Sequence, residues 1–294
     1  MSRWLHALRT LFHAVALVAC IAGAAEVQAA SRALNGDRRV ALVIGNASYR
    51  FSPLKNPVND AQAMAVALTE LGFDVTLLQD ARFDLMLDAM RNFARKGQNA
   101  EVRLFYYAGH GMQVKGRNFL VPVDAVISGE EEVPLATADL NELVTQLGAL
   151  KTGVNILILD ACRNNPFAGN AMVGPDGRVV RFRGAVAPGL AAVDAPQGTL
   201  VAFATAPGAI AMDGGNLSNS LYTRYLLDNI RTPALPVEQL FKRVRIAVAR
   251  DTQRLQIPWE SSSLMGDFCF RDAPGKPCSG DDAPQIGPIQ VRPR

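Results

Sequence analysis

Two short apolar runs in this chain each end close to one side chain that can do nucleophilic chemistry. The run 103–107 is followed by Ala-Gly and then His110, and the run 155–159 is followed by Asp-Ala and then Cys162. Continuous apolar runs are typical of buried parallel strands, and open α/β sheets place their sites at the carboxyl ends of such strands. A thiol beside an imidazole is the minimal arrangement for nucleophilic acyl transfer, so the two runs predict a Cys162–His110 dyad.

Each of the two residues also has a simpler interpretation when it is taken alone. Cys162 could be a buried structural thiol, and His110 could be a core histidine whose nitrogens are satisfied by neighbours. The catalytic interpretation depends on the two strand ends meeting, and it therefore depends on the fold.

Apolar periodicity along the rest of the chain predicts an α/β fold. Strands are predicted at 40–44, 73–78, 102–107, 155–159, 199–204 and 264–270, and a hairpin at 113–121. Helices are predicted at 59–71, 83–95, 137–150, 217–230 and 237–254. This alternation favours a mostly parallel central sheet of about six strands with helices on both faces.

The blocks that carry these residues resemble the caspase-like cysteine peptidases, and within them the metacaspase-like branch found in bacteria. His110 and Cys162 lie 52 positions apart in Tyr-Tyr-Ala-Gly-His-Gly and Asp-Ala-Cys-Arg-Asn-Asn-Pro-Phe, close to the caspase spacing of about 50. Further matching blocks lie at 39–46, 54–61, 205–208 and 258–263. The resemblance covers about 39–270 and implies a caspase-like three-layer sandwich with cysteine endopeptidase activity.

The resemblance also implies roles for neighbouring residues. It assigns the oxyanion donors to the backbone N–H groups of Gly111 and Cys162, and Gly111 would also suit a tight turn. In metacaspases two aspartates line a pocket for arginine or lysine, and their positions match Asp60 and Asp160. Alternatively, Asp60 caps the helix that it begins, and Asp160 holds the cysteine loop by a hydrogen bond.

The chain departs from the metacaspase pattern at two positions and in one segment. Ala108 replaces a serine that many metacaspases have before Gly-His, and Asn164 replaces an aspartate close to the thiol. The acidic insert that serves calcium in many metacaspases is missing from 113–121. Calcium dependence, which the family allows, is therefore not supported by the sequence, and neither a metal nor any other cofactor is assigned.

The N-terminus predicts an export signal over residues 1–29. Arg3 and Arg9 precede an apolar stretch at 11–23, and a small-residue cleavage box ends at Ala29. The expected location is therefore the periplasm or the medium. Two alternatives stay open: Cys20 could be the lipidated cysteine of a lipobox, or the stretch could remain as an uncleaved anchor, although it is short for a membrane span.

The remaining sequence predicts one catalytic domain at 38–271 with a long loop at 164–197, followed by a Pro/Gly-rich disordered tail at 272–294. Cys269 and Cys278 could pair in an oxidising compartment and leave Cys162 as the free thiol, unless they are unrelated thiols. The composition, 49% hydrophobic and 19% charged, is that of a globular protein, and a net charge of +3 does not argue for nucleic acid.

Together these features predict an exported cysteine endopeptidase, acting as a monomer on polypeptide substrates and cleaving after arginine or lysine. No stable membrane span is expected after processing. Two other classes remain: a caspase-fold binding or regulatory module with little activity, and a Cys-His hydrolase or acyltransferase that acts on something other than a peptide.

Overall fold

The computed structural model describes residues 38–50, 52–150, 152–162, 171–173, 179–181, 190–207, 209, 211, 217–273 and 278, with the backbone alone at 162, 171–173 and 179–181. From Arg39 onward the chain forms one compact unit. None of the helices in this described part is long and apolar enough to cross a membrane.

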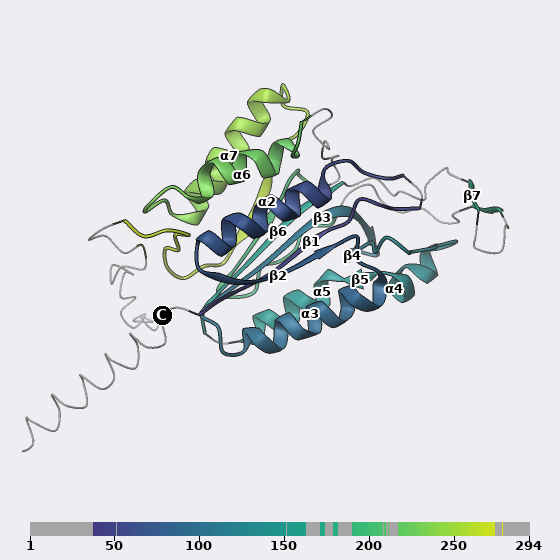
Figure 1. Ribbon diagram of the computed structural model, residues 1–294, viewed down its shortest axis with the longest axis horizontal. Helices are drawn as coiled ribbons and strands as arrows, with labels where there is room; N and C mark the ends of the chain where they lie inside the picture. The colour runs from purple at the N-terminus through teal and green to yellow at the C-terminus, as the bar shows by residue number, and fades with distance from the viewer. Residues whose placement is uncertain are drawn as a thin grey trace, which may run out of the picture. The chain divides into compact units, whose positions relative to one another are not determined.

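A mostly parallel sheet forms the centre of this unit (Figure 1). Its strand order is β10-β9-β6-β3-β1-β2, and only the edge strand β10 runs antiparallel to its neighbour. The strands are β1 (Arg39–Gly45), β2 (Phe73–Gln79), β3 (Val102–Val114), β6 (Val154–Cys162), β9 (Thr199–Phe203) and β10 (Trp259–Ser262). Because β2 and β3 flank β1 on opposite sides, the strand order reverses at β1, and ligands bind in α/β sheets at the carboxyl ends of the strands beside such a reversal.

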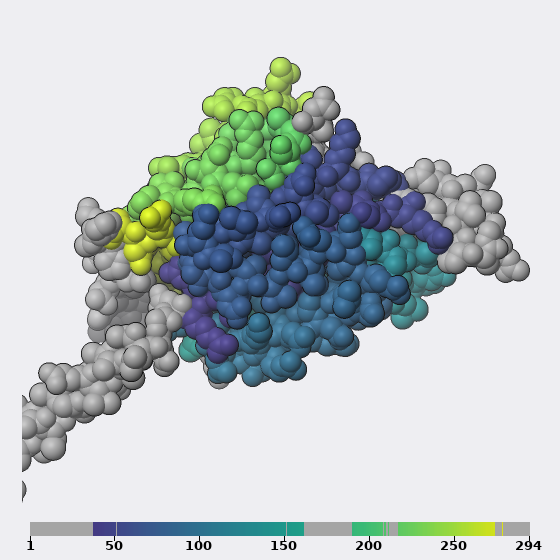
Figure 2. Space-filling model, viewed as in Figure 1, coloured from purple at the N-terminus to yellow at the C-terminus, as the bar shows by residue number. Residues whose placement is uncertain are grey.

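Helices cover both faces of the sheet, which confirms the predicted α/β sandwich. On one face lie α2 (Pro57–Glu70), α6 (Leu221–Ile230) and α7 (Val237–Asp251), and on the other α3 (Phe83–Gly97) and α5 (Leu140–Gly148) (Figure 1). Side chains of the central strands alternate between the two cores: Leu104 and Tyr106 face the first, while Phe105 and Tyr107 face the second. Figure 2 shows α6 packed beside α2, far from it in sequence, and α7 packed against α6.

A hairpin extends β3 beyond the sheet. It joins β3 to β4 (Arg117–Leu120), which pairs in turn with β5 (Ala138–Asp139). Lys115 and Gly116 have φ values of 50° and 79°, the left-handed pair that a tight two-residue hairpin turn requires, so the predicted hairpin is confirmed. The connection to β5 contains the short helices η1 (Glu130–Glu132) and α4 (Val133–Ala136). Asp139 caps α5 by accepting a hydrogen bond from the Asn141 N–H at 2.9 Å.

The predicted strand at 264–270 is wrong. The last strand in the described part of the chain is β10, which pairs with β9 from Trp259↔Phe203 to Ser262↔Leu200, whereas Cys269 makes an isolated bridge with Pro236. The apolar side chains of Phe268 and Phe270 belong to the core cluster that also contains residues of α2 and α7, and they are not part of the sheet. Burial alone does not distinguish a strand from an irregular core segment.

The long segment 164–197 contains a short antiparallel pair, β7 (Ala171–Val173) and β8 (Val179–Arg181). Most of its other residues lie outside the described part of the chain, as do the predicted leader and most of the predicted tail.

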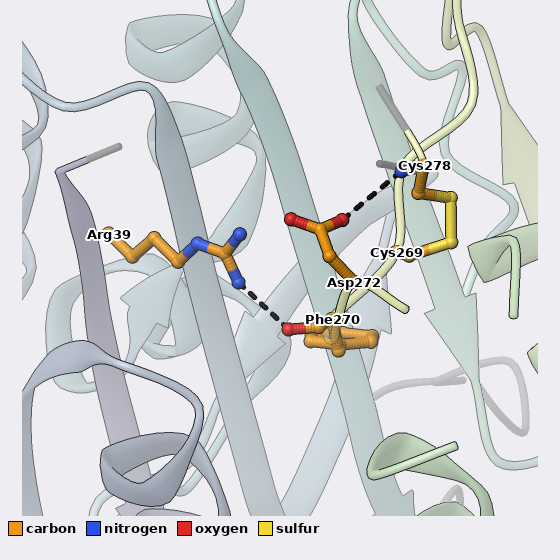
Figure 3. Close-up of a disulfide and its surroundings, with 5 residues drawn as sticks. All are labelled: Arg39, Cys269, Phe270, Asp272 and Cys278. Carbon is orange, nitrogen blue, oxygen red and sulfur yellow. Dashed lines mark hydrogen bonds between the residues drawn. A yellow bond between two sulfur atoms is a disulfide. The ribbon is translucent and has the colours of Figure 1, made fainter. Parts of the chain in front are cut away.

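The end of the described chain is tied to the start of β1 (Figure 3). A disulfide joins Cys269 and Cys278, whose Cα atoms are 5.4 Å apart, and the Asp272 carboxylate accepts the Cys278 N–H at 3.1 Å. Arg39 donates to the Phe270 carbonyl oxygen at 2.8 Å, and its guanidinium also lies 5.8 Å from the Phe268 ring centroid. These contacts hold the C-terminal segment at the amino end of the sheet.

Candidate active site

The backbone of the sheet brings His110 and Cys162 side by side. Strands β3 and β6 are adjacent and parallel, and their register runs from Val102↔Val154 to His110↔Cys162. Adjacent strands lie about 4.8 Å apart, so the two residues are neighbours at the carboxyl end of the sheet. The Cys162 side chain and residues 163–170 lie outside the described part of the structure.

The imidazole of His110 is buried and held by its neighbours. Its Nε2 lies 2.7 Å from the carbonyl oxygen of Ser52, and its ring packs on Tyr49 with ring centroids 4.4 Å apart. Because a carbonyl oxygen only accepts hydrogen bonds, Nε2 carries the proton, and Nδ1 is then the basic nitrogen of the neutral ring. Ser52 has a φ of 56°, a left-handed conformation that is uncommon for residues other than glycine and that often marks functional sites.

Gly109, directly before His110, has a backbone conformation that favours glycine. Its φ is +153°, and a Cβ there would lie 2.6 Å from the Tyr49 hydroxyl and 2.7 Å from the Tyr107 hydroxyl. Gly111 is not in the tight turn that its type suggested: it lies within β3 opposite Leu120. A Cβ on Gly111 would lie 3.3 Å from the Ala161 Cβ, so glycine there allows β3 to approach the residue before Cys162 closely.

The carboxylates of Asp60 and Asp160 meet at the amino end of α6. Asp60 lies in the first turn of α2, and its Oδ1 accepts hydrogen bonds from Asn219 Nδ2 at 2.8 Å and from the Ser220 N–H at 3.0 Å. Asp160 lies on β6, and its Oδ2 accepts from the hydroxyls of Ser220 and Thr223. The two aspartates are 1% and 8% exposed, so both carboxylates are held out of bulk water at one residue, Ser220.

The observed hydrogen bonds of the two aspartates differ from the structural roles that the sequence suggested as alternatives to substrate binding. Asp60 does not cap α2, which begins at Pro57 after the N-cap Asn56 and has no side-chain cap, and its Oδ1 binds the Ser220 N–H at the start of α6 instead. Asp160 does make hydrogen bonds, but the described ones go to α6. The positive end of the α6 dipole favours negative charge at this point.

Ser220 and Thr223 form a network with Tyr106 of the neighbouring strand. The Ser220 hydroxyl caps α6 by accepting the Thr223 N–H at 3.0 Å, and the Tyr106 hydroxyl lies 2.6 Å from Thr223 Oγ1. Burial raises the pKa of Tyr106 well above 10, and the negative charges of Asp160 and Asp60 raise it further. Tyr106 thus stays neutral at any working pH and remains able to donate a hydrogen bond.

Asp80 fixes the loop that carries Tyr49 and Ser52. Its carboxylate accepts the backbone N–H groups of Ala47 and Ser48, both at 2.8 Å, and the Ser48 hydroxyl at 2.6 Å. Burial by itself raises the pKa of Asp80, but the hydrogen bonds from Ser48 and Ala47 outweigh it and lower the pKa below its ordinary value. The ionised carboxylate therefore stabilises this loop.

Several of these site residues were missed from the sequence, Asp80 and Tyr106 among them. Tyr49 and Ser52 follow the first strand in a segment without periodicity, and no sequence signal marks them. Ser220 did carry a signal, because a serine directly before an apolar helical pattern is a typical N-cap, yet the predicted helix began at 217. Thr223 lies inside that helix, and it belongs to the candidate site only because its hydroxyl contacts Asp160 and Tyr106. Within the described residues, no three His, Cys, Asp or Glu side chains are grouped so that they could hold a metal ion.

Comparison with known proteins defines the class. The caspase domain model, Peptidase_C14, matches residues 38–269. The chain therefore belongs to the caspase-domain family of cysteine peptidases.

Particular relatives share this domain. Mucosa-associated lymphoid tissue lymphoma translocation protein 1 of Homo sapiens is 30% identical over 195 residues, 65% of this chain, and its Mus musculus homolog is 30% identical over 251 residues, 83% of this chain. The chain spans only 22% and 28% of the lengths of these two relatives. The crystal structure of caspase-1 from Spodoptera frugiperda shares the fold with a TM-score of 0.57 and 16% identity, covering 81% of this chain and 92% of that one.

Proposed function

We propose that this protein is an exported cysteine endopeptidase of the metacaspase-like branch, with Cys162 as nucleophile and His110 as general base, that cleaves after arginine or lysine. The observation that carries the proposal is the register His110↔Cys162 at the carboxyl end of the sheet. The contact between His110 Nε2 and the Ser52 carbonyl supports it, because it leaves Nδ1 to exchange a proton with the thiol.

The reaction follows from these roles. The Cys162 thiol loses its proton to His110, and the thiolate attacks the scissile carbonyl carbon. The backbone N–H groups of Gly111 and Cys162 would stabilise the oxyanion that develops. The protonated imidazole then donates its proton to the leaving amine, and water, deprotonated by His110, releases the acyl group from sulfur.

The same site supports a preference for a cationic residue on the acyl side of the scissile bond. Asp160 lies two residues before Cys162, and the hydrogen bonds of Ser220 bring Asp60 to the same point. Two carboxylates there would attract a guanidinium or ammonium group and repel a substrate aspartate.

The dyad is tested on purified mature protein with a positional peptide library. Cys162→Ala and His110→Ala should each abolish cleavage while the far-UV circular dichroism and melting temperature stay close to wild type. A variant that keeps most of its turnover would rule out the role given to that residue. Wild-type protein that binds the peptides without cleaving any of them would favour a binding module instead.

The specificity is tested with Asp60→Asn and Asp160→Asn, which keep the shape of the side chain and remove its charge. Losing one carboxylate from a desolvated charge pair costs about 2–5 kcal/mol, so kcat/KM for arginine substrates should fall by more than about tenfold. Substrates with a neutral residue at that position should lose much less. Equal losses for both substrate classes would make the two aspartates structural, and a wild-type preference for aspartate would refute the proposed pocket.

Export is supported by the Cys269–Cys278 disulfide, because disulfides persist in oxidising compartments. The intact mass of native protein should correspond to a chain that begins near Ala30 with one disulfide, or to a chain lipidated at Cys20. A full-length, reduced species in the cytosol would contradict this part of the proposal.

A further inference from the structure

The backbone of His110 is held by two tyrosine hydroxyls. The His110 N–H donates to the Tyr49 hydroxyl at 2.8 Å, and the Tyr107 hydroxyl donates to the His110 carbonyl oxygen at 2.7 Å. The two hydroxyl oxygens are 3.1 Å apart. The amide N–H and the carbonyl of one residue are thus each bound by a tyrosine, and the two tyrosines touch.

Counting the protons favours one direction for this chain of hydrogen bonds. Each hydroxyl has a single proton, and the shortest of the contacts assigns the Tyr107 proton to the His110 carbonyl. The Tyr107 oxygen can then accept the proton of Tyr49, whose other acceptor at the same distance of 3.1 Å is the Val121 carbonyl. These contacts allow a closed path from the His110 N–H through both hydroxyls and back to the His110 carbonyl, and the Val121 carbonyl lies within reach of both hydroxyls, 3.0 Å from that of Tyr107 and 3.1 Å from that of Tyr49.

The surroundings are built to admit these hydroxyls. Both oxygens occupy the space that a side chain at position 109 would need, so Gly109 is required for the pair to fit. Asn46 donates to the Val121 carbonyl at 3.2 Å, and the Val121 N–H donates to the His110 carbonyl at 3.0 Å. A fully hydrogen-bonded buried network of this kind resists displacement, because any group that leaves it loses a partner in a medium of low dielectric constant.

Tyr49 also acts on the imidazole directly. Its ring packs on the His110 ring with an interplanar angle of 47°, while the Ser52 carbonyl holds Nε2 from another direction. Tyr49 therefore fixes both the backbone and the ring plane of His110, and Tyr107 fixes the backbone alone.

We propose that Tyr49 and Tyr107 are positioning residues, a tyrosine clamp that sets the place of His110 relative to Cys162 through the His110 backbone. This inference rests on the proposed Cys-His chemistry and adds two residues that do not touch the substrate. A shift of about 1 Å in a reacting group can cost two orders of magnitude in rate, so small displacements of His110 should be visible in kinetics.

The test uses Tyr49→Phe, Tyr107→Phe and the double variant in the mature protein. Phenylalanine keeps the ring of Tyr49 against His110 and removes only the hydroxyls. We expect kcat to fall by about tenfold or more in each single variant, with KM within about twofold, because the loss concerns the reacting groups and not substrate binding. The double variant should lose little more than the worse single variant, because the two hydroxyls act through the same residue.

A second readout separates positioning from plain stabilisation and needs no peptide substrate. The rate of Cys162 alkylation by iodoacetamide, measured against pH, reports how readily the thiolate forms beside His110. We expect the midpoint of this profile to move upward, toward the ordinary thiol pKa of about 8.5, when either hydroxyl is removed.

The matched control is Thr199→Val, which also deletes a buried hydroxyl. Thr199 Oγ1 accepts a hydrogen bond from Asn155 at 3.2 Å. It lies at the amino end of the sheet, because Asn155↔Thr199 is seven positions, about 23 Å, from the register of His110 and Cys162 along β6. This variant should lower the melting temperature by a few degrees and leave the alkylation profile unchanged.

The outcomes are distinct. Tyrosine variants that lose stability like Thr199→Val but keep the wild-type kcat and alkylation profile would overturn the clamp while the proposed peptidase stands. If the His110→Ala variant has the same alkylation profile as the wild type, the proposed function is refuted, and the proposed clamp is refuted with it.

Discussion

Ser220→Ala is the substitution that tests most directly how α6 is joined to the candidate pocket. The Ser220 hydroxyl caps α6 through the Thr223 N–H and also donates to Asp160, while the Ser220 backbone N–H binds Asp60. Alanine keeps the last of these bonds and removes the first two. A lost N-cap costs about 1 kcal/mol, and a lost hydrogen bond to a buried carboxylate about 1.5–3 kcal/mol.

The two costs add to about 2.5–4 kcal/mol, and the expected loss lies at or slightly below the lower end of this sum. Thr223 Oγ1 still donates to Asp160 at 2.7 Å, so the carboxylate is not left without a partner. We expect a loss of about 2–3 kcal/mol in the free energy of unfolding, which for a domain of this size is a fall of about 4–12 °C in melting temperature. Urea unfolding followed by circular dichroism measures the first quantity and a thermal scan the second. Ser220→Thr, which keeps the hydroxyl, should lose less than about 1 kcal/mol.

The control is Asp139→Ala, which removes the N-cap of α5 on the opposite face of the sheet together with an ion pair to the exposed Arg117. It should lose about 1 kcal/mol and leave the substrate preference unchanged. Ser220→Ala should in addition weaken cleavage of arginine substrates more than that of neutral ones, because Asp160 is less well held. If Ser220→Ala costs no more stability than Asp139→Ala and keeps the full arginine preference, then Ser220 is only a helix cap and the link between α6 and the carboxylates has been overestimated.

Three further substitutions test other parts of the structure. Gly109→Ala should cost more than about 3 kcal/mol and abolish activity, because its Cβ would overlap two hydroxyls and its φ of +153° is disfavoured for alanine; wild-type melting and turnover would contradict this. Asp80→Asn should lower the free energy of unfolding above about pH 4. The pKa of Asp80 is lowered in the folded protein, so its carboxylate stabilises the fold above the ordinary carboxyl pKa, and this stabilisation is lost as the pH falls through the pKa of the folded state. A stability difference from wild type that persists unchanged at pH 2 would refute this prediction. Arg103→Met should cost more than about 3 kcal/mol in urea unfolding, because the fully buried guanidinium donates to the backbone carbonyls of three neighbours, whereas the alkylation profile of Cys162 should not change.

The sequence by itself determined the five parallel strands of the sheet and the two residues at the carboxyl ends of its central pair. Apolar runs that end at His110 and Cys162 indicate buried parallel strands, since burial on both faces requires continuous apolar side chains. The structure brings these strand ends into register without an intervening strand. The hairpin at Lys115-Gly116 was also predictable, because its turn needs local backbone freedom that sequence shows directly.

The sequence was less informative about strand pairing, because a buried apolar side chain does not show whether its backbone pairs with a strand. Phe268 and Phe270 form an apolar run like that of a strand, but they pack into the core beside the helices, while the edge strand is the less apolar Trp259–Ser262. An edge strand is defined by backbone hydrogen bonds to its neighbour, and neither the hydrophobicity nor the periodicity of a sequence predicts which backbone will lie beside it.

Only the tertiary structure decided how the candidate site is assembled around His110. Asp60 and Ser220 are 160 positions apart, and Tyr49 and His110 are 61 apart, yet each pair is joined by a buried hydrogen bond. Local propensity acts over a few residues, whereas such contacts exist only after α2, α6 and the central strands have packed. Residue types could therefore indicate a thiol and an imidazole at two strand ends, and the packing of distant segments determined which hydroxyl and carbonyl groups hold His110 and which hydroxyls bind Asp160.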